Sequence, residues 1–237
     1  MTLVLATATP LEMRAALKNL ETDRDAMETV PERGAVQARL AGREAFLVVT
    51  GVGPVNAALE IGRVLGRFDV SGVVHVGLAG SFDADSAPLG SAVLASAEVF
   101  PEYGVAGDDG LALTDGDFAF AQRERGEQKI FQAIELKPDA AAATLGLSLP
   151  LGISRGTFLT VAGVTGTRRR ALERKSRHGA LAENMEGFAL ALAAFAENVP
   201  YIELRTISND VGERDWSKWV FEKALGRLGD TIAGLFA

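Results

Sequence analysis

Short hydrophobic runs alternate with longer amphipathic stretches along most of the chain. The runs predict β-strands at 3–8, 45–50, 72–76, 92–97, 157–161 and 201–207. The amphipathic stretches predict helices at 10–20, 54–67, 138–146, 167–178, 185–198 and 217–235. The runs at 46–49 and 73–76 are continuous rather than alternating, which is typical of a sheet covered by helices on both faces. We therefore expect a three-layer α/β architecture.

Nothing in the sequence divides the chain, because it shows no internal repeat, low-complexity tract or linker. We expect a single domain over residues 1–237, a length that one large α/β domain can fill. The segment 115–137 is the most polar and least periodic part, and both a surface insertion and an edge helix fit it.

Hydrophobic residues make up 48% of the chain and charged residues 23%, which argues against disorder and against a coiled coil. The formal net charge of −7 argues against nucleic acid or an anionic membrane as the main partner, because either needs a basic surface. Cysteine is absent, and the two histidines, His75 and His178, leave little room for a metal site. With no signal peptide and no membrane span predicted, we expect a soluble, cytoplasmic enzyme or binding protein.

Two glycine-rich stretches, at 50–56 and 76–81, are expected where strands run into loops. In the first, Asn56 stands in place of the third glycine of G-x-G-x-x-G, which argues against a dinucleotide-binding fold. The P-loop motif is also absent from the sequence. These glycines, Gly80 among them, either supply tight turns or let the backbone approach a ligand at the carboxyl edge of the sheet.

The first of three polar clusters follows the first predicted strand. Thr9, Pro10 and Glu12 match a helix capping box, with Thr9 as the N-cap and Glu12 at N3. This structural role alone would explain them. In the functional alternative, Glu12 lies at the carboxyl edge of the sheet and deprotonates a water molecule.

The second and third clusters have both structural and functional interpretations. The stretch 183–188 opens an alanine-rich helix, where acidic residues complement the helix dipole. The same stretch suits a sugar, because Glu186 can accept hydrogen bonds from two vicinal hydroxyls while Met185 covers an apolar edge. The stretch 205–210, which includes Ser208, is either a turn with a capping side chain or a group that hydrogen-bonds a heterocyclic leaving group.

Other conspicuous residues have structural interpretations. We expect His75 to be a hydrogen-bonded core histidine. The basic run at 168–175 is expected to form a solvated helix face. Trp216 and Trp219 suit either the core or a lid over a ligand, and we favour the core.

Taken together and in this order, the clusters resemble the nucleoside phosphorylase/nucleosidase superfamily. The matching pieces are PLE at 10–12, TGVGPVNAA at 50–58, VGLAG at 76–80, NMEG at 184–187 and RTISN at 205–209. The resemblance implies a mixed central sheet and a homodimer or higher homo-oligomer. It also implies that the chain hydrolyses the N-glycosidic bond of a small purine nucleoside without a metal or an organic cofactor.

Mapped position by position, the resemblance makes Glu12 the glutamate that activates the water, and Met185 and Glu186 the pair that holds the ribose. Asn209 stands where adenine-releasing relatives carry the aspartate that protonates the base. The turn at 164–167 matches the segment that lines the purine. The candidate substrate-binding residues are Met185, Glu186, Asn184, Val164, Thr165, Gly80 and Ser208.

The chain departs from the superfamily pattern at two positions. Asn184 stands where many relatives have a second glutamate, which implies different contacts to the ribose or the water. Asp210 adjoins Asn209, and shifting the alignment by one residue would restore an acid at the base site.

Within the superfamily the chain is most similar to the futalosine hydrolase family of the alternative menaquinone pathway, in the stretches 100–104, 164–167, 183–187 and 207–216. This similarity implies release of hypoxanthine from futalosine. Three alternatives stay open: a methylthioadenosine/S-adenosylhomocysteine nucleosidase, which would need the shifted alignment, a phosphorylase, and a non-catalytic nucleoside-binding protein. The stretch 100–104 lies where relatives meet the partner subunit near the 5′ end of the ligand.

Overall fold

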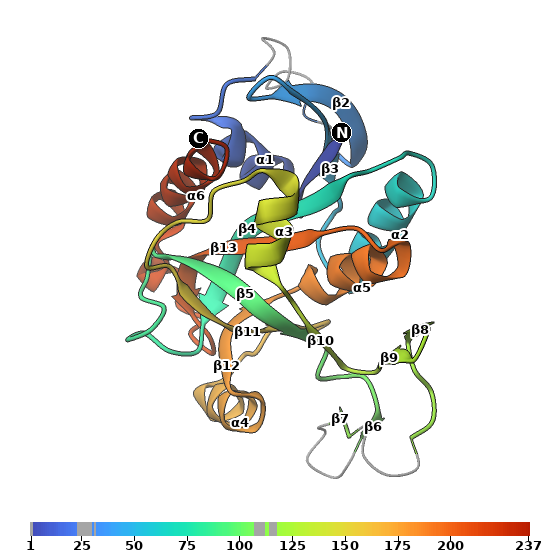
Figure 1. Cartoon of the computed structure of the whole chain (residues 1–237). Coiled ribbons are helices and arrows are strands. Elements are labelled where there is room, and N and C mark those ends of the chain that lie inside the picture. Colours follow the sequence, from blue (N-terminus) through green and yellow to red (C-terminus); the bar gives the residue numbers. More distant parts are fainter. Residues whose placement is uncertain (1, 23–29, 31, 107–111, 114–117) are drawn as a thin grey trace.

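A mixed sheet forms the centre of the computed structural model, which describes residues 2–22, 30, 32–106, 112–113 and 118–237. Within these residues the sheet has nine strands. Eight follow the order β10-β5-β11-β12-β4-β1-β3-β2, and the ninth, β13, pairs with β4 and β5 (Figure 1). The strands are β1 Leu3–Thr7, β2 Gly34–Leu40, β3 Arg43–Val49, β4 Gly72–Ser81, β5 Ala92–Val99, β10 Ala133–Glu135, β11 Ser154–Thr160, β12 Ala180–Asn184 and β13 Tyr201–Asp210. Strand β1 is parallel to β3 and β4, whereas β12 is antiparallel to β4.

Helices pack on both faces of this sheet (Figure 1). They are α1 Pro10–Leu17, α2 Pro54–Leu65, α3 Pro138–Leu145, α4 Arg168–His178, α5 Gly187–Glu197 and α6 Phe221–Leu235. Leu5 of β1 lies in the same core as Met13, under α1, α3 and α6, whereas Val4 packs with Ile61 and Leu190 under α2 and α5. Neighbouring strand residues point into opposite cores, which explains the continuously hydrophobic runs. The predicted three-layer α/β fold with a mixed sheet is confirmed.

Strand β4 continues for five residues beyond the predicted strand, so the glycine-rich stretch 76–81 lies inside a strand and is not a turn. A Cβ atom on Gly77 would lie 2.7 Å from Glu12 Oε1, and one on Gly80 would lie 3.2 Å from Asn209 Nδ2. Glycine in a strand often marks such a close approach. These glycines therefore let polar side chains lie directly against the strand.

The sequence pattern does not predict β2 and β12. Strand β2 is at the edge of the sheet, and its exposed residues alternate with half-buried ones and with the buried Ala38 and Leu40, so it lacks a hydrophobic run. Strand β12 is buried throughout but contains Glu183 and Asn184, residues that are rarely buried without partners. As a consequence, α5 begins at Gly187 rather than at 185.

Other element boundaries differ by a few residues. Helix α1 ends at Leu17 rather than at 20, and β13 extends to Asp210. The last predicted helix begins instead with a 3₁₀ turn, Trp216–Lys218, and α6 follows from Phe221.

The polar segment before α3 contains strands in its described part, 118–137, so the edge-helix interpretation is wrong there; residues 115–117 lie outside the described residues. The hairpin β8 Arg123–Arg125 and β9 Gln128–Ile130 leads into β10 at the sheet edge, and β6 Val105–Ala106 pairs with β7 Ala112–Leu113. The β6–β7 and β8–β9 pairs project away from the central sheet (Figure 1). Across the part of the chain that the structure describes, no helix is long and apolar enough to cross a membrane.

Candidate active site

Glu12 is fixed at the carboxyl end of β1 by hydrogen bonds to both of its oxygens. The capping box is present, because Thr9 Oγ1 accepts from the Glu12 N–H and Glu12 Oε2 accepts from the Thr9 N–H at 2.9 Å. Glu12 Oε1 accepts from the Leu78 N–H of β4, also at 2.9 Å. The capping interpretation is therefore confirmed. The capping bonds leave the Glu12 carboxylate at the carboxyl ends of the strands, where the functional alternative requires it. The residue is 7% exposed.

Glu186 lies between β12 and α5, with its side chain turned toward the start of α2. It is the N-cap of α5 but makes no side-chain capping bond. Its Oε1 instead accepts from the Gly53 N–H at 2.9 Å, and Gly53 has a φ of 96°, which favours glycine. Burial raises the pKa of Glu186 to about 7, while Arg205 lowers it and Glu12 raises it.

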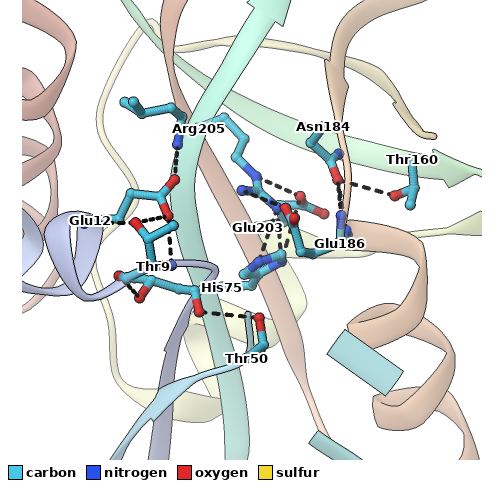
Figure 2. Close-up of polar contacts among 12 residues, drawn as sticks. Thr9, Glu12, Thr50, His75, Thr160, Asn184, Glu186, Glu203 and Arg205 are labelled. Atoms are coloured by element: carbon cyan, nitrogen blue, oxygen red, sulfur yellow. Dashed lines mark hydrogen bonds and ion pairs between the residues drawn. The ribbon is translucent and has the colours of Figure 1, made fainter. Parts of the chain in front are cut away.

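Arg205 lies beside both glutamates, and the sequence analysis did not single it out. Its side chain is 1% exposed, and Nη1 lies 3.8 Å from Glu186 Oε2. A Cβ atom on Gly77 would lie 2.7 Å from both Arg205 Nη1 and Glu12 Oε1, so both groups lie against the same glycine. Figure 2 shows the guanidinium beside Glu186. An arginine within a hydrophobic strand was the signal that could have identified it.

His75 and Glu203 support Arg205 from the core (Figure 2). Glu203 Oε1 accepts from Arg205 Nε at 2.9 Å, and Arg205 Nη2 lies 3.0 Å from His75 Nε2. His75 is fully buried, and its Nδ1 is 3.0 Å from the Tyr201 hydroxyl. Burial and the neighbouring guanidinium hold the pKa of His75 well below its ordinary value, so the ring is neutral. The prediction of a hydrogen-bonded core histidine is confirmed.

Asn184 uses its side chain within the protein. Its Oδ1 accepts from the backbone N–H groups of Glu186 at 2.9 Å and Gly187 at 2.7 Å. Its Nδ2 donates to Glu98 Oε1, and the Thr160 hydroxyl also lies within hydrogen-bond distance of Oδ1 (Figure 2). These bonds fix the backbone that carries Glu186.

Met185 and the turn at 164–167 differ in exposure. Met185 is half-buried and packs against the core that contains Leu159 and Val161. Val164 is 46% exposed, whereas Thr165 is buried and donates to Glu183 through both its N–H and its hydroxyl. Within this turn, Val164 therefore has the side chain that is free to cover a ligand.

Arg174 contradicts the prediction that the basic run is a solvated helix face. Arg169 fits that prediction, with an 83% exposed side chain, but the side chain of Arg174 is only 6% exposed. Arg174 donates to Glu183 and Thr165 through Nη1 and to Glu102 through Nη2. One face of α4 is thus anchored to β12 by a buried ion pair, which a run of basic letters cannot reveal.

Asn209 lies on β13 beside Gly80 of β4, and a β-bulge between Ile207 and Asn209 shifts the register there. Its Oδ1 accepts from the Ser208 hydroxyl at 2.8 Å, and its Nδ2 donates to the Asp210 carbonyl. Gly80 is two residues from Leu78, the backbone partner of Glu12, so both candidates lie along the same stretch of β4.

Trp216, in the segment that follows Asn209, does not lie in the core, so that prediction is wrong for this residue. This residue is 62% exposed and stacks on Trp219, with ring centroids 4.6 Å apart. A Cβ atom on Gly212 would lie 2.8 Å from the Thr167 carbonyl oxygen, so the segment packs on the turn at 164–167.

The assembled groups favour one kind of chemistry. Two carboxylates and a guanidinium at the carboxyl edge of a sheet can orient water and sugar hydroxyls and can stabilise positive charge that develops on a sugar. Among the described residues, no cluster of three or more His, Cys, Asp or Glu side chains could hold a metal ion.

Comparison with known proteins supports the resemblance in the sequence. A futalosine hydrolase of Streptomyces coelicolor is 39% identical over 80% of this chain and 77% of the relative. A 5′-methylthioadenosine/S-adenosylhomocysteine nucleosidase of Colwellia psychrerythraea is 28% identical over 80% of this chain and 75% of the relative. The S. pneumoniae enzyme of that name, solved with a transition-state inhibitor, has a TM-score of 0.73 at 21% identity, covering 100% of this chain and 98% of the other, and shows the fold alone. A family model described as the phosphorylase superfamily matches residues 2–237, and the chain therefore belongs to that superfamily.

Proposed function

We propose that this protein is an N-glycosyl hydrolase that converts futalosine to hypoxanthine and dehypoxanthine futalosine in the alternative menaquinone pathway. The observation that carries the proposal is the placement of Glu12 and Glu186 on either side of Arg205, at the sheet edge that also holds Asn209. The name of the 39% identical relative favours futalosine over methylthioadenosine, since the nucleosidase reported above is only 28% identical.

The mechanism follows from the charges that develop as the bond breaks. The sugar becomes cationic, resembling an oxocarbenium ion, and the departing purine becomes electron-rich. Glu12 takes a proton from the attacking water, whose oxygen bonds to the anomeric carbon as the bond to the purine nitrogen breaks; the purine leaves as an anion and takes up a proton from solvent water. Glu186 accepts hydrogen bonds from the two vicinal ribose hydroxyls, and its negative charge stabilises the cationic sugar. Arg205 faces the Glu186 carboxylate, whereas the backbone N–H groups of Thr9 and Leu78 hold Glu12.

Asn209 is proposed to act on the leaving group. Its NH₂ group donates to N7 or O6 of a 6-oxopurine, both of which gain electron density as the bond breaks. The 2.8 Å bond from Ser208 fixes the amide oxygen, and the amino group has a second N–H for the base besides the one that it donates to the Asp210 carbonyl. In this arrangement the amide orientation selects hypoxanthine.

The remaining candidates have supporting roles in this proposal. Met185 and Val164 cover the apolar surfaces of the ribose and the purine, while Thr165 holds the turn through Glu183. Gly80 lets the base approach the strand. Asn184 acts through the backbone of Glu186 rather than through the substrate.

We also propose that the protein works as a homodimer through α2. Val52, Val55 and Leu59 at and near the start of this helix are 49%, 81% and 48% exposed, and neighbouring exposed apolar groups favour an interface. Gly53, which binds Glu186, lies in the same region. Light scattering should give twice the chain mass for the wild type and the chain mass for Val55→Asp; a monomeric wild type would refute the dimer.

The activity is tested with purified protein and futalosine in phosphate-free buffer, with hypoxanthine detected by chromatography. Hypoxanthine release that does not depend on added phosphate is the expected result. Release only with phosphate would indicate a phosphorylase, and release only from methylthioadenosine would indicate the alternative nucleosidase. Binding of futalosine without release would indicate a nucleoside-binding protein.

A further inference from the structure

Two buried acids that the mechanism does not use meet behind Arg205. Glu98 of β5 and Glu203 of β13 are both fully buried, and their carboxyl groups lie close together beside Gly187. A Cβ atom on Gly187 would collide with carboxyl oxygens of both residues. The first residue of α5 is therefore a glycine because the carboxyl pair occupies the space where a side chain would begin.

The surrounding donors decide which member of the pair carries the proton. Glu203 accepts from Arg205 Nε and from the Tyr201 hydroxyl, both at 2.9 Å, so it has the contacts of a carboxylate. Burial and the neighbouring Glu203 hold the pKa of Glu98 well above its ordinary value, although Thr160 and Asn184 lower it. Of the two, Glu98 is therefore the carboxyl whose surroundings favour the neutral acid.

Two chains of contacts lead from this pair to Glu186. In the first, Glu203 binds Arg205, whose Nη1 faces the Glu186 carboxyl at 3.8 Å. In the second, Glu98 Oε1 accepts from Asn184 Nδ2 at 2.6 Å, and Asn184 Oδ1 binds the Glu186 N–H at 2.9 Å. The pair thus holds both the cation that faces the Glu186 side chain and the amide that fixes its backbone.

We propose that Glu98 and Glu203 are positioning residues that act as one carboxylic acid–carboxylate pair to hold Glu186, through Arg205 on one side and Asn184 on the other, in the geometry that binds the ribose. This inference rests on the proposed function for its substrate. Neither acid touches the nucleoside in this scheme. Both act through Arg205 and Asn184, which position Glu186, the group that binds the ribose.

The charges around Glu186 give the proposal a signature that a purely structural role lacks. Glu186 is faced by Arg205 from β13, by Glu12 from α1 and by the Gly53 N–H from α2. The pair itself is also faced by Tyr201 and by the neutral His75. Replacing Glu203 with a neutral residue removes a carboxylate that competes for the guanidinium. Arg205 then stabilises the Glu186 carboxylate more strongly, and the pKa of Glu186 falls.

Glu203→Gln and Glu98→Gln separate the two chains of contacts, and Glu60→Gln is the matched control. Glu60 is a glutamate of α2 that is also largely buried but pairs with the exposed Arg63. Glu203→Gln should move the acid limb of kcat/KM to lower pH by about one unit. Glu98→Gln leaves the charge unchanged but cannot serve Asn184, Thr160 and Glu203 together, so it should lower kcat about 10–100-fold with the acid limb in place. The control, Glu60→Gln, should keep the wild-type kcat and the wild-type acid limb.

A ¹³C-carboxyl NMR titration of the free protein, with Glu186→Gln to assign the signal, measures the same pKa without substrate. It distinguishes failure of the inference from failure of the proposed function, because it needs no turnover. An unchanged pKa of Glu186 in Glu203→Gln would overturn the proposal. A Glu98→Gln variant that keeps the wild-type kcat and shows only a lower melting temperature would also overturn the proposal. If Glu203→Gln does not fold, Tyr201→Phe removes one donor from Glu203, and an unchanged kcat and Glu186 titration in that variant would overturn the proposal.

Discussion

The ionisation of the Glu186 carboxyl links one side chain to the pH dependence of the reaction. Its pKa is raised to about 7, chiefly by burial. The ionised form offers both oxygens to the ribose hydroxyls as acceptors only and has the charge that stabilises the cationic sugar, whereas the neutral acid uses one oxygen as a donor. We therefore expect kcat/KM to rise with pH up to a plateau, with an apparent pKa near 7, in a profile measured from pH 5 to 9. Glu186→Gln should remove this limb along with most of the activity; a limb that survives in the variant would belong to another group.

The same shift has a defined sign for stability. A carboxyl whose pKa is higher in the folded than in the unfolded state contributes less stability as pH rises, here between its ordinary pKa of 4.5 and about 7. The shift corresponds to about 3 kcal/mol across this window. Between pH 5 and pH 7.5, urea unfolding should show wild type losing about 2 kcal/mol of this relative to Glu186→Gln, which does not titrate. A pH-independent difference between the two proteins would contradict the assigned pKa.

Glu12 combines a structural and a chemical role in one carboxylate. A glutamine there keeps one accepting oxygen for the capping box but turns its amino group toward a donor, either at Thr9 or at Leu78. Glu12→Gln should therefore lower the free energy of unfolding by about 1–3 kcal/mol. Turnover should fall about 10²–10⁴-fold, as expected for a lost general base. Stability from urea denaturation and kcat from hypoxanthine release separate the two effects; near-normal kcat would leave only the capping role.

At the scale of elements, α4 shows how a buried ion pair differs from an exposed one. Arg174 of this helix is paired with Glu183 and Glu102, whereas Arg169 pairs with Glu173 at the surface. Arg174→Met would leave a buried carboxylate unpaired, and we expect it to cost about 3–5 kcal/mol. Arg169→Met, the matched control on the same helix, should change stability by less than about 1 kcal/mol.

Thermal and urea unfolding of the two variants test this difference, and Glu183→Gln added to Arg174→Met should recover part of the loss. Equal effects of the two single variants would mean that the buried pair contributes no more than the surface pair.

The hydrophobic pattern predicts those elements whose side chains enter the two main cores. Strand β1 is the clearest case, because adjacent residues such as Val4 and Leu5 both point into apolar cores. The pattern fails at β12, where Glu183 and Asn184 are buried because partners from α4, β5 and β11 satisfy them. Such partners are distant in sequence. Local patterning therefore cannot predict that a polar stretch will be a central strand.

At the scale of the whole molecule, the sheet edge brings together residues from opposite ends of the chain. The polar clusters at Glu12, Glu186 and Asn209 were recognisable in the sequence because each lies at or near a strand end. Arg205 and the Glu98–Glu203 pair were not, since their importance comes from pairing across β4, β5 and β13. The sequence thus predicted the fold class and the proposed chemical groups, but not the buried charges that hold them.

The most direct measurement compares kcat/KM for futalosine with kcat/KM for its 6-amino counterpart. A 6-oxopurine offers acceptors at N7 and O6 to the Asn209 NH₂ group, whereas the 6-amino group presents a donor there and leaves a polar pair unmatched. We expect wild type to prefer futalosine by roughly 10²–10⁵-fold. Asn209→Asp should narrow or invert this ratio, and Asn209→Ala should lower turnover by about 10²–10³-fold. A wild type that prefers the 6-amino substrate, or loss of activity in Asp210→Asn but not in Asn209→Ala, would contradict these expectations.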